Sequence, residues 1–226
     1  PLPGMRWRDV RNGMAASGAR AALLRARQVL ARPSWVADVV IGGRPLSFGN
    51  LHQQVPGGRD LNAFKTWIDA QFDHGVTWRD IEWLRGLWQG RLLLKGILEV
   101  DDARTAVASG ADGIVVSNHG GRQLDAAPAS ITALPAIARA VGSQTEVLMD
   151  GGVRSGVDIF KALALGARGV LIGRPWAWAL AAQGQAGVSQ LLAHWQRELL
   201  LTMTLAGVTR IADINPSHLI TPQEHP

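Results

Sequence analysis

The sequence contains no cysteine and no tyrosine among its 226 residues. Without cysteine the chain has no disulfide, no thiolate metal site and no cysteine nucleophile. The six histidines never fall at ligand spacing beside a carboxylate, which argues against a histidine metal site. Long apolar runs are also missing: the nearest to membrane-spanning length, around residues 170–182, is interrupted by Arg174 and Pro175.

Charge is not concentrated on any segment in the way that nucleic-acid binding requires. The formal net charge is +5, and the high isoelectric point follows largely from the lack of tyrosine and cysteine. The basic residues are scattered and are not interleaved with aromatic residues, so we expect no nucleic-acid partner. With 47% hydrophobic and 18% charged residues, the composition indicates a globular protein with a sizeable core.

From Thr77 onward, short apolar runs alternate with amphipathic segments, which is typical of consecutive βα units and a parallel sheet. Thr77 and Asp80 predict a capped helix start. The predicted strands are residues 92–97, which we expect to be buried, 113–116, 147–149 and 170–172. The predicted helices run from Asp101–Asp102 to Gly110, over 130–141 and 157–165, and near 176–182 and 188–206.

Residues 10–75 lack this alternation and are predicted to form one long excursion between strands, such as a lid, a docking surface or a mobile segment. A helix is expected near residues 19–31, where arginines stand beside leucine and valine. This basic amphipathic composition suits an anionic membrane surface. Packing on the barrel, or on a part of the protein outside this chain, would use the same residues.

Polar residues follow each predicted strand. Lys95 ends the first, Ser117, Asn118 and His119 follow the second, Asp150, Gly151 and Gly152 follow the third, and Gly173 and Arg174 follow the fourth. In parallel α/β barrels the carboxyl ends of all strands open on one face, where active sites are built. We therefore expect these residues to lie together.

The residue types predict particular chemistry. In the segment VSNHGGRQLD, His119 is a candidate base beside Arg122, which can clamp a carboxylate. In DGGVRSG, glycine amides between a strand and a helix start, with Arg154 and the following Gly173–Arg174, predict a phosphate site. The simpler alternatives are a packed histidine, a structural ion pair for Lys95 and a tight turn with a solvated arginine.

The segments LLLKG, SNHGGRQLD, DGGVRSGVDIFKALALGA and GVLIGRP together resemble the FMN-dependent α-hydroxy-acid dehydrogenase and oxidase family, from Pro1 to about Ile214. Through WRDIEWLRGLW, GGRPLSFGNL and LTMTLAGVTRI the chain is most similar to the membrane-associated bacterial members that oxidise L-lactate. The resemblance implies an α/β fold, a (β/α)8 TIM barrel. The chain, 1–226, would supply its C-terminal half, with a long loop segment, 10–75, before the last four βα units in 77–214.

The resemblance also implies a role for individual residues. His119 matches the active-site base, and Arg6 and Arg122 match the arginines that bind the substrate carboxylate. Lys95 matches the lysine at the polar edge of the flavin ring. The other implied cofactor-binding residues are Ser117, Asp150, Gly151, Gly152, Arg154, Gly173 and Arg174. The family's substrate-binding tyrosines and the aspartate that pairs with the histidine have no match, so we expect the chain to be a C-terminal fragment.

The implied function is FMN-dependent oxidation of L-lactate to pyruvate, with electrons passed to a quinone or another acceptor of the respiratory chain. We expect peripheral association with the cytoplasmic face of the inner membrane, and a homo-oligomer at full length. Two alternatives remain open: oxidation of another 2-hydroxy acid, as by mandelate dehydrogenase or glycolate oxidase, and a non-catalytic half-barrel that binds FMN.

Overall fold

The computed structural model describes residues 18–43, 51, 53–55 and 61–220. By its internal contacts the chain divides into two compact units, Pro1–Gly75 and Val76–Pro226. Each unit is described by itself.

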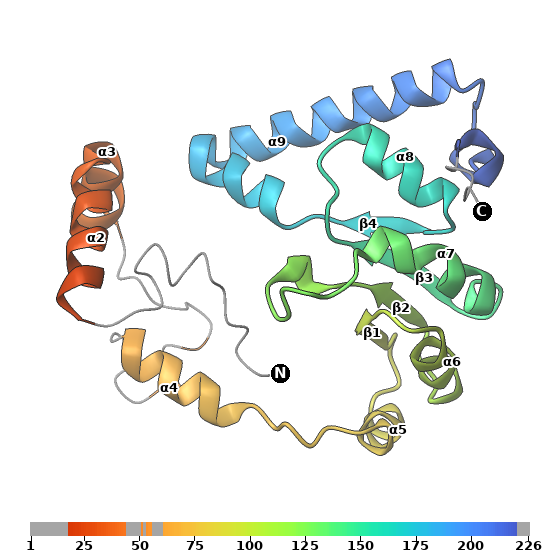
Figure 1. Cartoon of the computed structure of the whole chain (residues 1–226), viewed down its shortest axis with the longest axis horizontal. Coiled ribbons are helices and arrows are strands. Elements are labelled where there is room, and N and C mark those ends of the chain that lie inside the picture. The colour runs from red at the N-terminus through yellow and green to blue at the C-terminus, as the bar shows by residue number, and fades with distance from the viewer. Residues whose placement is uncertain (1–17, 44–50, 52, 56–60, 221–226) are drawn as a thin grey trace. The chain divides into compact units, whose positions relative to one another are not determined.

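The described part of the first unit is helical (Figure 1). It contains α2 (Ala19–Leu30), α3 (Pro33–Trp35), a π-helical turn η1 (Val36–Ile41) and α4 (Leu61–Gln71). The helix predicted near residues 19–31 is thus confirmed as α2. Ala21 is its buried side chain, whereas Leu23 and Leu30 are 71% and 80% exposed.

The second unit contains a parallel sheet with the order β1-β2-β3-β4. The strands are β1 (Leu93–Ile97), β2 (Gly113–Val116), β3 (Glu146–Asp150) and β4 (Gly169–Leu171). The helices α6 (Val100–Ala108), α7 (Ser130–Val141) and α8 (Gly156–Ala164) connect them in turn. The predicted alternation of strands and helices is therefore confirmed, with bounds that move by one or two residues.

Helix α5 (Trp78–Leu87) precedes the sheet and begins as its capping residues predict. The Asp80 carboxylate accepts hydrogen bonds from the backbone N–H of Thr77, at 2.6 Å, and from its hydroxyl, at 2.7 Å. Both bonds hold the chain in the turn that starts the helix.

The core lies between the sheet and helices α6 and α7. Ile114 and Val116 of β2 and Val147 and Met149 of β3 are at most 2% exposed and pack against Leu134, Ile137 and Val141 of α7. The alternation of these strand residues places their side chains on one face of the sheet. Burying each large side chain contributes roughly 1.5–3 kcal/mol. This packing fixes the strand ends that carry the candidate site.

The expectation that strand 92–97 is buried is wrong. Leu93 is 47% exposed, and β1 alternates between exposed and partly buried residues until Ile97. Among the described residues β1 pairs only with β2, at the edge of the sheet.

The chain ends in helix α9 (Arg174–Leu205) and two short 3-10 turns, η3 (Ile211–Asp213) and η4 (Pro216–His218). Gln183 and Gly184 have non-helical dihedral angles and break α9 where two separate helices were predicted. A second small core, around Phe160 and Met203, joins α8 to α9. It fixes the helix that follows the DGGVRSG loop.

Candidate active site

A hydrogen-bonded cluster joins the middle of β1 to the carboxyl ends of β2 and β3. The Lys95 ammonium of β1 lies 2.8 Å from Asp150 Oδ2 at the end of β3, and it donates to Ser117 Oγ after β2 at 2.9 Å. Ser117 is 1% exposed, whereas the Lys95 side chain is 40% exposed. The structure therefore brings together residues that lie up to 55 positions apart in the sequence, as parallel strands predict. The ion pair that was the simpler alternative for Lys95 is also present.

The loop that carries His119 has an unusual backbone. His119, Gly120 and Gly121 all have positive φ, of 55°, 68° and 66°, and His119 is the only non-glycine residue with positive φ in the described part of the chain. Side chains with a Cβ rarely adopt this conformation, and such residues cluster at functional sites. The His119 N–H donates to Ser117 Oγ at 3.1 Å, and the Gly120 N–H donates to Asn118 Oδ1 at 3.0 Å. Local hydrogen bonds therefore hold the turn.

The surroundings of His119 favour its neutral form. Burial lowers the pKa of its imidazole below the ordinary 6.5, the Lys95 charge lowers it further, and the Asp150 carboxylate acts in the opposite direction. At pH 7 the ring is therefore mainly neutral and able to accept a proton. This is the protonation state that a general base requires.

Ser130 connects the His119 loop to the core, and the sequence reasoning missed it. Ser130 is 2% exposed at the start of α7, and its Oγ accepts the Asn118 N–H at 3.0 Å. A Cβ on Gly151 would lie 3.1 Å from the same Oγ and 2.9 Å from Asn118 Oδ1. The loops after β2 and β3 thus meet at Ser130, and a side chain at position 151 would push them apart.

At the start of α8, three backbone N–H groups beside the predicted phosphate site are bound by side chains of the chain itself. The N–H of Arg154 donates to Asp158 at 2.9 Å, that of Asp158 to Ser155 at 3.1 Å and that of Gly156 to Glu198 of α9 at 2.8 Å. Side chains of the protein already satisfy these donors. The sequence offered no signal for Glu198, which lies 42 positions from the glycine that it binds.

The candidate arginines are placed differently from one another. Arg174 reaches the His119 loop, with one guanidinium nitrogen 3.5 Å from the Gly120 carbonyl oxygen. Arg122 ends the 3-10 turn His119–Gly121, and its side chain and that of Arg154 are exposed. Arg6 lies outside the described residues. The structure therefore brings Arg174 and Arg122 to the same loop.

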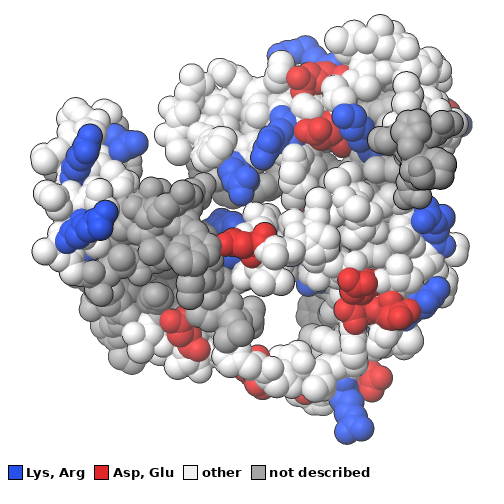
Figure 2. All heavy atoms as spheres, viewed as in Figure 1, with Lys and Arg blue, Asp and Glu red and all other residues white. Residues whose placement is uncertain are grey.

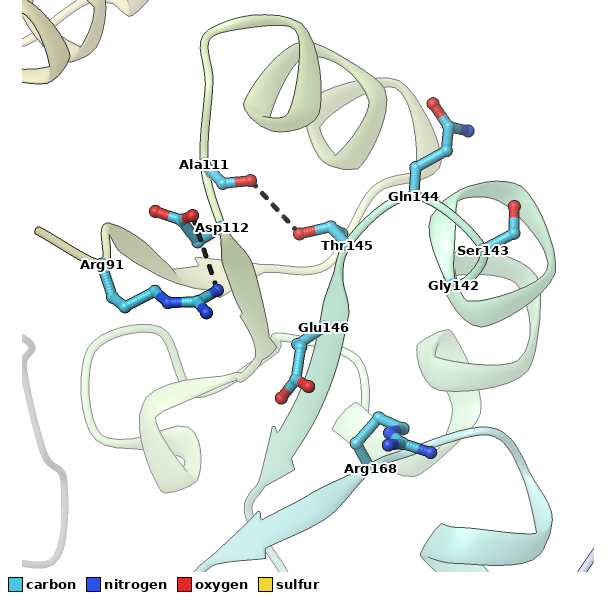
Figure 3. A pocket seen from close by; sticks show the side chains of 9 residues that line it. All are labelled: Arg91, Ala111, Asp112, Gly142, Ser143, Gln144, Thr145, Glu146 and Arg168. Atoms are coloured by element: carbon cyan, nitrogen blue, oxygen red, sulfur yellow. Dashed lines mark hydrogen bonds and ion pairs between the residues drawn. The ribbon is translucent and has the colours of Figure 1, made fainter. Parts of the chain in front are cut away.

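A separate cavity of about 400 Å³ opens at the amino ends of the strands, away from this cluster (Figure 3). Arg91, Asp112, Glu146 and Arg168 contribute charges of both signs to its lining. Asp112 is paired with Arg85 at 3.0 Å and with Arg91 at 3.7 Å. Mixed and partly paired charges do not select one kind of ligand. The candidate site thus remains at the carboxyl ends.

Neither a cluster of metal-binding side chains nor a helix able to cross a membrane is present among the residues that the structure describes. They form no group of three or more histidine, cysteine, aspartate or glutamate side chains that could hold a metal ion. Among these residues no helix combines the length and the apolar character needed to cross a membrane.

Comparison with known proteins identifies the family. Residues 1–221 match the family model described as FMN-dependent dehydrogenase. The chain is 50% identical to L-lactate dehydrogenase of Caulobacter vibrioides over 219 residues and 46% identical to L-lactate dehydrogenase of Vibrio cholerae over 220 residues. Each alignment covers 97% of this chain but only 57% and 58% of the relative. The chain thus spans somewhat more than half of the length of these relatives.

Solved structures give the same result. The monotopic membrane protein (S)-mandelate dehydrogenase matches with a TM-score of 0.84 and 34% identity, over 98% of this chain and 58% of that one. A mandelate oxidase matches with a TM-score of 0.60 and 52% identity, over 62% of this chain and 43% of that one. The predicted fold class, part of an α/β barrel, is confirmed. The chain belongs to the FMN-dependent dehydrogenase family.

Proposed function

We propose that the full-length protein to which this chain belongs oxidises L-lactate to pyruvate with FMN as its cofactor. The observation that carries the proposal is the cluster of Lys95, Ser117, Asp150 and the neutral His119 at adjoining strand ends. Oxidation of a 2-hydroxy acid beside a flavin requires a cation, a buried hydrogen-bond acceptor and a base that lie close together. The identity to L-lactate dehydrogenases supports the choice of substrate.

The residues of the cluster offer a fitting environment for FMN. Asp150 Oδ1 is buried and lacks a hydrogen-bond partner among the described residues. It could therefore accept a hydrogen bond from a hydroxyl of the ribityl chain. Gly152 has φ +82° and open space where a side chain would stand. With Ser117 and Gly151, these residues would hold the ribityl chain, and Arg154, Gly173 and Arg174 would hold the phosphate.

The remaining residues act on the substrate. Arg122 and Arg6 would clamp its carboxylate, and a guanidinium fork pairs with both carboxylate oxygens. A nitrogen of the neutral His119 ring would take up a proton. FMN, when bound, supplies the acceptor for the two electrons. The Lys95 ammonium would stabilise negative charge at the polar edge of the flavin ring.

A second candidate substrate is mandelate, which the TM-score of 0.84 to (S)-mandelate dehydrogenase favours. The test is anaerobic reduction of the full-length, FMN-loaded protein. L-lactate or (S)-mandelate is added, and reduction is measured as the loss of flavin absorbance. Faster bleaching by L-lactate at equal concentration supports the proposal. Faster bleaching by mandelate selects the second candidate, and bleaching by neither leaves an FMN-binding protein without this activity.

We also propose that the protein associates peripherally with the cytoplasmic face of the inner membrane through α2 and delivers electrons to a quinone. The likeness to a monotopic membrane dehydrogenase supports this. In Figure 2 the charged atoms visible in the α2 region are those of lysine or arginine. We also propose that the full-length protein forms a homo-oligomer. Cross-linking of the full-length protein and reduction of a soluble quinone by lactate test these two points.

A further inference from the structure

Strand β1 has an irregularity next to Lys95. Lys95 pairs with Val115 of β2, but Ile97 pairs with the next residue, Val116, so Gly96 is skipped in the ladder. Gly96 has φ +104°. A bulge of this kind bends a strand and re-aims neighbouring side chains, and bulges are over-represented beside active sites.

The space above Gly96 is taken by the imidazole of His119. A Cβ built on Gly96 would lie 2.8 Å from His119 Cε1, 3.5 Å from Nε2 and 3.8 Å from Nδ1. Real Cβ atoms essentially never approach a heavy atom within 3.0 Å. The ring therefore rests directly against the glycine backbone.

The backbone of His119 has little freedom to move away. Its N–H is bound to Ser117, its φ is 55°, and the next N–H in the turn is bound to Asn118. Gly96 thus limits the movement of the ring on one side, and the hydrogen bonds of the loop limit the movement of the His119 backbone. A side chain at position 96 would have to rotate the ring away.

We propose that Gly96 is a positioning residue for His119: its bulge in β1 provides the space in which the imidazole lies beside Lys95. The catalytic consequence of this role rests on the function proposed above, whereas the contact itself does not.

The direct test of the contact is a double-mutant cycle on thermal unfolding of the full-length protein, with Gly96→Ala, His119→Ala and the double variant. Gly96→Ala introduces the strain of alanine at positive φ whether residue 119 is histidine or alanine. Only when His119 is present does the new Cβ also clash with the imidazole. We expect Gly96→Ala to lower Tm more in the presence of His119 than in its absence. Equal losses in the two backgrounds would overturn the proposal.

The cycle remains decisive if Gly96→Ala does not fold. Folding of the double variant would then support the clash, whereas failure of both variants would assign the effect to backbone strain alone. Gly207→Ala is the matched control for positive φ, because Gly207 has φ +70° and no heavy atom within 4 Å of a built Cβ. Gly169→Ala is the control for a strand glycine, because its Cβ would make an ordinary contact of 3.5 Å.

The position of the ring is measured by titrating the His119 imidazole by NMR. In folded Gly96→Ala we expect its midpoint to move up, because the ring would leave the charge of Lys95, which lowers its pKa. We expect kcat for flavin reduction to fall by about 10²-fold, since a misplacement of about 1 Å costs that much. An unmoved midpoint would refute the positioning role. If the unmutated protein did not oxidise lactate, the proposed function would be refuted. The double-mutant cycle and the titration would still test the contact between Gly96 and His119.

Discussion

Removal of the Ser130 hydroxyl should loosen the loop that carries His119. In Ser130→Ala the Asn118 N–H loses its acceptor, which lies 3.0 Å away on a side chain that is 2% exposed. A buried donor left without a partner costs about 1–3 kcal/mol. Asn118 itself is only partly buried, so water can reach part of the site, and we expect about 1–2 kcal/mol. This loss of stability arises where the loop after β2 contacts the start of α7.

The assay combines denaturant unfolding of the full-length protein with anaerobic flavin reduction. We expect a lower free energy of unfolding and a lower kcat. The ion pair of Lys95 with Asp150 should persist, because the Ser130 hydroxyl bonds to Asn118 and not to either of these residues. Thr105→Val is the control, since it removes a hydroxyl whose bond to Asp101 is exposed. An unfolding free energy lowered no more than in this control would show that the hydrogen bond does not hold the loop.

Three further predictions concern the proposed catalytic residues. His119→Gln should bind FMN but reduce it about 10²–10⁴-fold more slowly with lactate, because it removes the base; near-normal stopped-flow rates would end that assignment. The lowered pKa of His119 predicts that its imidazole, titrated by NMR in this chain, takes up a proton only below the ordinary pH range of histidine. In Lys95→Met the midpoint should rise, because a positive charge that disfavours protonation is removed, and an unchanged midpoint would contradict the charge argument. Arg122→Lys should raise KM and lower kcat, because an ammonium lacks the planar fork of the guanidinium. Arg174→Ala should instead weaken FMN retention, measured by equilibrium dialysis. If each variant showed the other's phenotype, the two assignments would be reversed.

The parts of the fold that depend on local pattern could be predicted from the sequence. Helix α7 was expected over residues 130–141 and is found there despite Pro135 inside it, because Leu134, Ile137 and Val141 recur at helical spacing and are buried. Strand positions followed from short apolar runs between turn residues. The convergence of Lys95, Ser117 and Asp150 followed from the direction of parallel strands alone.

Contacts between side chains from distant segments could not be predicted. A glycine in a strand indicates a bulge or a close approach, but the sequence does not say that the His119 ring lies over Gly96. The same is true of Glu198, which binds the Gly156 N–H and so occupies a helix start that was expected to hold an anion. Periodicity also could not show that Leu93 is exposed, because burial depends on what covers the strand and not on the strand itself.

The final prediction concerns the face of α2. Leu23 and Leu30 are one heptad apart, as are Arg20 and Arg27, so each pair lies on one side of the helix. Both leucines are largely exposed, and the helix contains no acidic residue. An exposed apolar stripe beside arginines is the arrangement of a helix that lies in an anionic membrane surface.

Each arginine near an anionic membrane contributes about 1 kcal/mol, so replacing Arg20, Arg25, Arg27 and Arg32 by glutamine should weaken binding by roughly 10³-fold. The measurement is sedimentation of the full-length protein with phosphatidylserine vesicles at low salt, together with lactate-driven flavin reduction, which should persist. The matched control removes the same charge from the second unit, at the exposed residues Arg104, Arg139, Arg197 and Arg210. If the control variant is released equally, net charge and not α2 governs the binding. If the α2 variant sediments as before, α2 is not the docking surface, because a surface contact of four arginines cannot lose all of them without losing affinity.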